Sequence, residues 1–131
     1  HEARERALKE PYRLEITGGP WVAEKAGPAL SPFARTLVDA AWTRRAEIDG
    51  LLTGTVEHWS LDRLALLDKL VLRIGVAELL YLPETPPKVV IDEAVELAKK
   101  FSTEKSGSFV NGVLDKIWKS QPTDRACGSE G

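Results

Sequence analysis

Lysines, aromatic rings and a side-chain amide lie close together late in the chain, in the segment KKFSTEKSGSFVN (99–111). Lysines hold phosphate groups, an aromatic ring stacks on a nucleobase, and an amide bonds a base edge, so this set is typical of contact with single-stranded RNA. A structural interpretation stays open beside it. Cations at the end of a helix also complement its dipole, and Phe109 could belong to a core.

The sequence offers little for catalysis. The two histidines, His1 and His58, are far apart, and the single cysteine, Cys127, lies near the end of the chain. No Cys/His cluster has zinc spacing, and neither a phosphate-binding loop nor a GxSxG motif occurs. The carboxylates of IDEAVE (91–96) are expected to complement a helix dipole rather than to act as acid–base or metal groups. We therefore expect no enzyme, no cofactor and no metal.

The composition is that of a globular protein of one domain. The chain has 131 residues, of which 43% are hydrophobic and 29% charged, with a formal net charge of −2. A domain that binds nucleic acid alone usually has a strong basic excess, so an RNA role here needs a local basic face or a partner's charge. No apolar run is long enough to cross a membrane, the charged opening HEARERALKE does not resemble a secretory signal, and one cysteine allows no internal disulfide. These features favour the cytoplasm.

Apolar periodicity predicts helices almost throughout. We expect them over about 2–16, from Pro32 after the cap Ser31, over 58–81 with Ser60 as cap, over 88–101, and from about Gly107 to Trp118. The inward faces are expected to include Ala7, Leu8, Tyr12 and Ile16 in the first helix, and Val89, Ile91, Ala94, Val95 and Ala98 in the helix 88–101. Residues 1–119 should form the folded domain and 120–131 a polar, disordered tail.

Three local features need a physical account. Pro11 lies inside the first predicted helix, so that helix either kinks there or has its regular part begin at Pro11. Asn111–Gly112 usually marks a hairpin turn, yet the flanking apolar residues keep helical spacing, so we predict a helix with Gly112 as a packing notch. Asn111 would then bond either RNA or the preceding loop. Arg73, within an apolar helix, should either extend its charged end to solvent or pair with an acid such as Asp68 or Glu78, unless Asp68, Arg73 and Glu78 form an exposed strip for a second protein.

Three segments closely resemble the NusB family of bacterial transcription antitermination factors: WSLDRLALLDKLVLRIGVAELLY (59–81), PPKVVIDEAVELAKKF (86–101) and TEKSGSFVNGVLDKI (103–117). ARERAL and YRLEITGG near the start resemble the opening of the same family more loosely. The resemblance implies an all-α fold of two three-helix bundles packed side by side, with six to seven helices. It also implies a non-catalytic role: with the small-subunit ribosomal protein NusE, such proteins bind single-stranded boxA RNA of ribosomal RNA transcripts and join the RNA polymerase antitermination complex.

Carried onto matching positions, the resemblance assigns RNA contact to Arg4, Tyr12, Phe101, Lys105, Ser108, Phe109 and Asn111. It places the protein partner on Asp68, Arg73 and Glu78. It permits both a monomer and a homodimer.

The chain departs from the family pattern in ways that weaken RNA binding. It begins without the family's arginine-rich run, and Ser108 stands where a lysine is common. Each lost phosphate contact lowers affinity and its salt dependence, so RNA binding by this chain alone should be weak. Ser102 replaces a usual glycine, and Pro11 a usual leucine.

Two other functions compete with the antitermination role. Related helical domains bind substrate in ribosomal RNA cytosine methyltransferases, but the short polar ending leaves no room for a cofactor-binding α/β domain. A protein-interaction module that has lost RNA contact is suggested by the missing arginines, Ser108 and the net charge. It predicts partner binding without any gain in boxA affinity.

Overall fold

The protein is described by a computed structural model, which covers residues 2–18, 21, 30–55 and 65–120. The described residues form six helices and no strand: α1 (Glu2–Thr17), α2 (Pro32–Thr43), α3 (Arg45–Thr55), α4 (Leu66–Tyr81), α5 (Pro87–Phe101) and α6 (Glu104–Lys119). Cys127 and the predicted tail lie outside the described residues, apart from Ser120, which caps α6. None of the helices described is long and apolar enough to cross a membrane.

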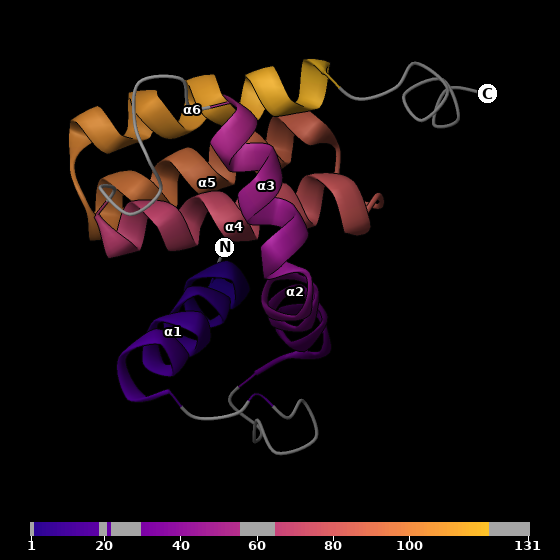
Figure 1. Cartoon of the computed structure of the whole chain (residues 1–131), viewed down its shortest axis with the longest axis vertical. Helices are drawn as coiled ribbons and strands as arrows, with labels where there is room; N and C mark the ends of the chain where they lie inside the picture. The colour runs from indigo at the N-terminus through magenta and orange to yellow at the C-terminus, as the bar shows by residue number, and fades with distance from the viewer. Residues whose placement is uncertain (1, 19–20, 22–29, 56–64, 121–131) are drawn as a thin grey trace.

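The helices form two groups (Figure 1). In one, α4, α5 and α6 pack against one another as a three-helix bundle. In the other, α1 packs on α2 and α2 on α3, and all three contact α4. α3 also lies across α6. The predicted all-α fold of two three-helix bundles side by side is confirmed.

The central helix is α4, because it is apolar on nearly every side. All residues from Leu70 to Leu79 are buried, and α4 contacts each of the other five helices. A helix that is apolar all round must be surrounded in this way. Gly75 allows α6 to approach closely, since a Cβ there would lie 2.7 Å from Leu114 Cδ1.

The notch predicted at Gly112 is wrong. Gly112 lies within α6, as the helical spacing predicted, but a Cβ added to it would meet no atom within 4 Å. The close approaches are elsewhere. Besides Gly75, Gly107 lies against the stem of Lys99, whose Cγ would be 2.9 Å from an added Cβ.

α1 runs without interruption through Pro11, so the alternative in which the regular helix begins at Pro11 is wrong. Its buried stripe includes Leu8, Pro11 and Leu14, which are spaced three apart. The prediction that Tyr12 and Ile16 point inward is wrong, because both lie off this stripe and are 42% and 63% exposed. Tyr12 is therefore available for contacts outside the chain.

Local cap chemistry sets several helix ends. The Ser31 hydroxyl accepts a hydrogen bond from the Ala34 amide at 3.1 Å, which confirms the predicted start of α2. The Thr103 hydroxyl does the same for the Ser106 amide at 3.1 Å, so α6 begins at Glu104 rather than near Gly107.

Two other predicted boundaries and faces need correction. α4 begins at Leu66, because Ala65 has an extended backbone (ψ 143°), so one unbroken helix over 58–81 is wrong. Ser60, its predicted cap, lies outside the described residues. In α5, Val89 is 43% exposed, whereas Val90 and Leu97 are buried with the predicted Ile91. The buried stripe keeps the predicted Ile91, Ala94 and Ala98, with which α5 packs on α4 and α6.

Candidate nucleic-acid interface

Two aromatic rings from distant parts of the chain meet in a small pocket. It has a volume of about 240 Å³ and is lined by Leu8, Lys9 and Tyr12 of α1, Leu67 of α4 and Phe101 of α5. Leu8 is buried, Phe101 is half-buried and Tyr12 is exposed, so the rings stand on an apolar floor and open to solvent. An aromatic-lined pocket of this kind offers a stacking surface to a planar base.

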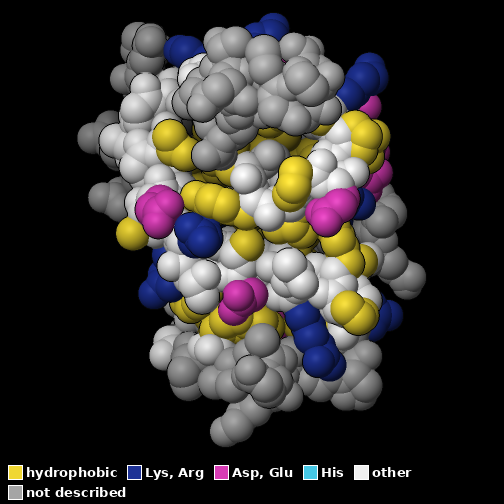
Figure 2. Space-filling model, turned by 90° about the vertical axis from the view of Figure 1, so that its right-hand side faces the viewer, with side chains coloured by type: hydrophobic (Ala, Val, Ile, Leu, Met, Phe, Trp, Pro, Cys, Tyr) yellow, Lys and Arg dark blue, Asp and Glu magenta, His cyan; other side chains and the backbone are white. Residues whose placement is uncertain are grey.

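Lysines surround the same end of the molecule. Lys100 is exposed, donates to both carboxylate oxygens of Glu5 at 2.9 Å, and lies 5.6 Å from the centre of the Phe101 ring. Lys9 and Lys105 are also exposed, and neither forms an ion pair with any described residue. Lys9 and Lys105 could therefore contact phosphate groups without breaking an ion pair within the described part of the chain. The face in Figure 2 differs, because its Lys and Arg side chains stand apart among carboxylates and hydrophobic groups.

The turn between α5 and α6 is held by a cluster of hydroxyl groups. The Ser106 hydroxyl lies 3.0 Å from that of Ser102 and 3.1 Å from that of Thr103. This turn and the start of α4 lie at the same end of the molecule, on the left in Figure 1. The turn thus fixes the first turn of α6, with Lys105, at the end where the aromatic pocket lies.

Arg4, which was predicted to contact RNA, forms an ion pair within the chain. Arg4 donates from both Nε, at 2.9 Å, and Nη2 to the carboxylate of Glu78, and its guanidinium lies 5.1 Å from the centre of the Phe33 ring. The hydrogen bond from Arg4 to Glu78 raises the pKa of Arg4. The predicted RNA contact of Arg4 stays a prediction, and such a contact would compete with the buried Glu78 carboxylate for the same guanidinium.

Arg73 forms two further ion pairs within the chain. It donates to the Asp49 carboxylate of α3 at 2.8 and 2.7 Å and to Glu15 of α1 at 2.8 Å. Burial lowers the pKa of Arg73, but the hydrogen bonds to Asp49 and Glu15 and the negative charges of these two residues together raise it by more. Both the predicted pairing with Asp68 or Glu78 and the predicted exposed strip are wrong, because Arg73 and Glu78 are buried and bonded to other helices. Asp68, half-buried in the first turn of α4, is left as the only member of that set with partial exposure.

The model of the NusB family matches residues 1–119. The chain belongs to the NusB family. A transcription antitermination protein NusB of Geobacillus kaustophilus is 43% identical, with 89% of this chain and 93% of the relative covered. One of Myxococcus xanthus is also 43% identical, with 87% and 90% covered.

Solved structures agree with this membership. T. maritima NusB superposes with a TM-score of 0.81 at 33% identity, over 95% of each chain. A chain in the crystal structure of antitermination factors NusB and NusE in complex with dsRNA superposes with a TM-score of 0.76 at 37% identity, over 91% of this chain and 95% of that one.

In this NusB-family chain, only some of the predicted RNA contacts share one end. Tyr12 and Phe101 line one pocket, and Lys105 lies in the first turn of the neighbouring α6. Phe109 is four residues after Lys105, hence on the same side of α6, and packs partly against the core. Ser108 is exposed on the adjacent side.

Asn111 does not share this side of α6. It lines a separate groove with Lys88 and Trp118, between α6 and the beginning of α5. Residues two apart on a helix are about 200° apart around its axis, so Asn111 and Phe109 point to different faces. The RNA contact predicted for Asn111 therefore stays a prediction that would need a strand to reach a second face of α6.

Sequence reasoning missed Lys9 and Leu67 as pocket residues. Lys9 could have been found, because it is three residues before Tyr12 and therefore on the same face of α1. Leu67 could not, since only the fold brings the start of α4 to this pocket.

Proposed function

We propose that this chain is a transcription antitermination factor that binds single-stranded boxA RNA of ribosomal RNA transcripts together with NusE. In this role it joins the RNA polymerase antitermination complex in the cytoplasm and catalyses no reaction. NusB-family membership supports the role, and the pocket that Tyr12 and Phe101 form beside exposed lysines is the observation that carries it.

The pocket suggests how a strand would be held. One base stacks on Tyr12 or Phe101 over the apolar floor, while Lys9 and Lys105 neutralise neighbouring phosphates. Stacking contributes about 1–3 kcal/mol per base and tolerates different bases, whereas lysine contacts make the affinity depend on salt.

The charge distribution explains the need for a partner. The chain's net charge is −2, and Arg73, which is buried, and Arg4, which is half-buried, are both bonded to carboxylates of the same chain. Only a few exposed lysines remain near the pocket, so the affinity of the chain alone should be low. NusE would add its own contacts to the same strand and so raise the overall affinity.

The direct test is a titration of fluorescently labelled boxA RNA with this protein, with and without NusE, at two salt concentrations. We expect tight binding only when both proteins are present, and weaker binding at the higher salt. NusE binding without any gain in RNA affinity would contradict the proposal and favour the protein-interaction module.

Two variants of α1 test the pocket itself. Tyr12→Ala should lower the RNA affinity of the complex about 5- to 100-fold, the equivalent of one lost stacking contact. Ile16→Ala is the matched control, because Ile16 is 63% exposed one turn later in the same helix. Equal losses in both variants would exclude Tyr12 as a specific contact.

A further inference from the structure

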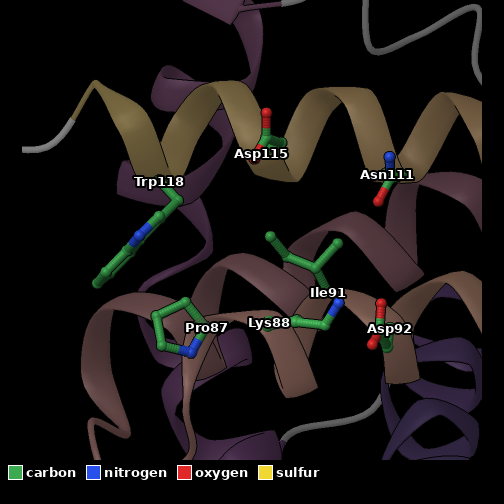
Figure 3. A pocket seen from close by; sticks show the side chains of 7 residues that line it. All are labelled: Pro87, Lys88, Ile91, Asp92, Asn111, Asp115 and Trp118. Carbon is green, nitrogen blue, oxygen red and sulfur yellow. The ribbon is translucent and has the colours of Figure 1, made fainter.

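A groove distinct from the aromatic pocket lies between the first turns of α5 and the second half of α6 (Figure 3). Its volume is about 410 Å³, and its lining comprises Pro87, Lys88, Ile91, Asp92, Asn111, Asp115 and Trp118. The proposed RNA contact does not use any side chain of this groove.

The groove has an apolar part and a polar part. Trp118 is half-buried and extends from α6 toward Pro87, and Ile91 lies between the two helices, 8% exposed. Asn111 extends from α6 toward α5, on the side where Asp92 stands. Asn111 and Trp118 are seven residues apart, which is about 10 Å along α6. A long side chain with an apolar stem and a polar tip matches this length and order.

The charges favour a cationic tip over a phosphate. Asp115 is bonded to Lys119 at 3.0 Å, and in Figure 3 its carboxylate points away from α5. Asp92 is exposed and forms no ion pair with any described residue, so its carboxylate is available to a ligand. Among the described residues, the lining of this groove contains one cation, Lys88, and two carboxylates, whereas the lining of the aromatic pocket contains Lys9 and no carboxylate. A strand of RNA therefore meets more negative charge here than in the aromatic pocket.

We propose that this groove binds an arginine side chain presented by a protein partner. The apolar stem lies against the Trp118 ring and Ile91, and the guanidinium N–H groups donate to Asp92 and to the side-chain oxygen of Asn111. The methylene groups of an arginine pack along apolar surface, while its planar guanidinium donates in a fork. This site does not depend on the proposed RNA role, because the two share no residue.

The probe is the peptide acetyl-Gly-Arg-Gly-amide, titrated into the ¹⁵N-labelled protein and followed by NMR. The chain has four tryptophans, and the indole signal of Trp118 is identified as the one missing from the Trp118→Phe variant. We expect the Trp118 indole and the Asn111 side-chain amide to shift, while the other indole signals stay in place. Acetyl-Gly-Glu-Gly-amide should leave all of them unchanged.

Three exposed positions then test the electrostatics without disturbing the core. Asp92→Asn should weaken binding of the arginine peptide about fivefold, and Lys88→Met should strengthen it by a similar factor. Glu96→Gln is the matched control, because it removes a carboxylate of the same helix outside the groove and should change nothing.

Three outcomes would overturn the proposal. The first is that the Trp118 indole does not shift up to the solubility limit of the arginine peptide. The second is that the glutamate peptide shifts it, or that Lys88→Met weakens binding, which would indicate an anion site. The third is that a short single-stranded RNA shifts it at lower concentration than the peptide, which would assign the groove to nucleic acid.

Discussion

The interface between α1 and α4 and the turn between α5 and α6 both contain cations, but they use them differently. At the interface, Arg73 is buried and Arg4 is half-buried, and both are bonded to carboxylates of other helices. Around the turn, Lys9 and Lys105 are exposed and, among the described residues, unpaired. The planar guanidinium suits a fixed, two-point internal bond, whereas the hydrated ammonium of lysine suits an exposed contact.

Because of this difference, we expect substitutions of the two kinds of cation to have different effects, one on stability and the other on binding. Loss of an interface arginine or its carboxylate should release α1 from α4 and lower the free energy of unfolding. Loss of an exposed lysine should leave the fold intact and affect only binding. Four predictions follow from this contrast.

The largest effect is expected at Glu78. Glu78→Gln leaves the Arg4 guanidinium with a neutral partner in place of Glu78 and with only the Glu93 carboxylate, at 3.7 Å, as a counter-ion. Breaking a fully buried ion pair from one side costs about 3–5 kcal/mol, which is the upper bound for this loss. Urea unfolding followed by circular dichroism measures this loss. Glu96→Gln, at an exposed carboxylate, should change the free energy of unfolding by less than about 0.5 kcal/mol. If both variants lost equally little, the interface would not depend on Arg4.

Exposed lysines should show the opposite behaviour. The double variant Lys9→Gln, Lys105→Gln should unfold like the unmodified protein but bind boxA RNA with NusE more weakly. The slope of log affinity against log salt should fall by about 0.7 for each lysine that contacts a phosphate. Lys119→Gln, at the far end of α6 and bonded to Asp115, is the control. An unchanged slope in the double variant would remove these two lysines from the RNA site.

Alanine substitutions at two glycines, one at the surface and one in the core, should have opposite effects on stability. Gly112→Ala should raise the free energy of unfolding by about 0.5–1 kcal/mol, because alanine favours the helix and its Cβ meets no atom within 4 Å. Gly75→Ala should lower it, since its Cβ would meet Leu114 at 2.7 Å inside the core. Thermal unfolding of the two variants measures both. A loss at Gly112 would show that a packing contact has been overlooked there.

Much of the fold could be predicted from the sequence, because apolar spacing reports which helices exist. Ser31 with Pro32 placed the start of α2 correctly, and the predicted end of a helix at residue 81 matches the end of α4 at Tyr81. The buried face of each helix was predicted less accurately than the helix itself. Tyr12 and Ile16 were assigned to the core because a short helix fits more than one apolar stripe, and Pro11 was not counted among the buried residues.

The site was predictable only where neighbours in sequence are neighbours in space. Phe101 and Lys105 flank one turn, so their grouping followed from the sequence. Arg4 and Glu78 are 74 positions apart in the sequence. The sequence around a charged residue does not indicate whether that residue will bind a phosphate group or a buried carboxylate. That distinction depends on tertiary packing, which periodicity does not report.

The smallest effect is expected at Tyr81, which is half-buried and so lies between the buried interface and the exposed surface. Its hydroxyl donates to Glu47 at 3.2 Å, and Arg44 lies 4.5 Å from the centre of its ring. Burial raises the pKa of Tyr81, and the hydrogen bond to Glu47 raises it further. A tyrosine in the unfolded chain ionises near pH ~10, so Tyr81 stabilises the fold fully below that pH, and the contribution is lost as pH rises through its higher folded pKa. Subtracting the alkaline absorbance titration of Tyr81→Phe from that of the unmodified protein isolates this group. A difference curve centred at or below the ordinary tyrosine pKa would mean that Tyr81 is solvated like a surface residue. The end of α4 would then resemble the exposed surface around the turn rather than the buried interface.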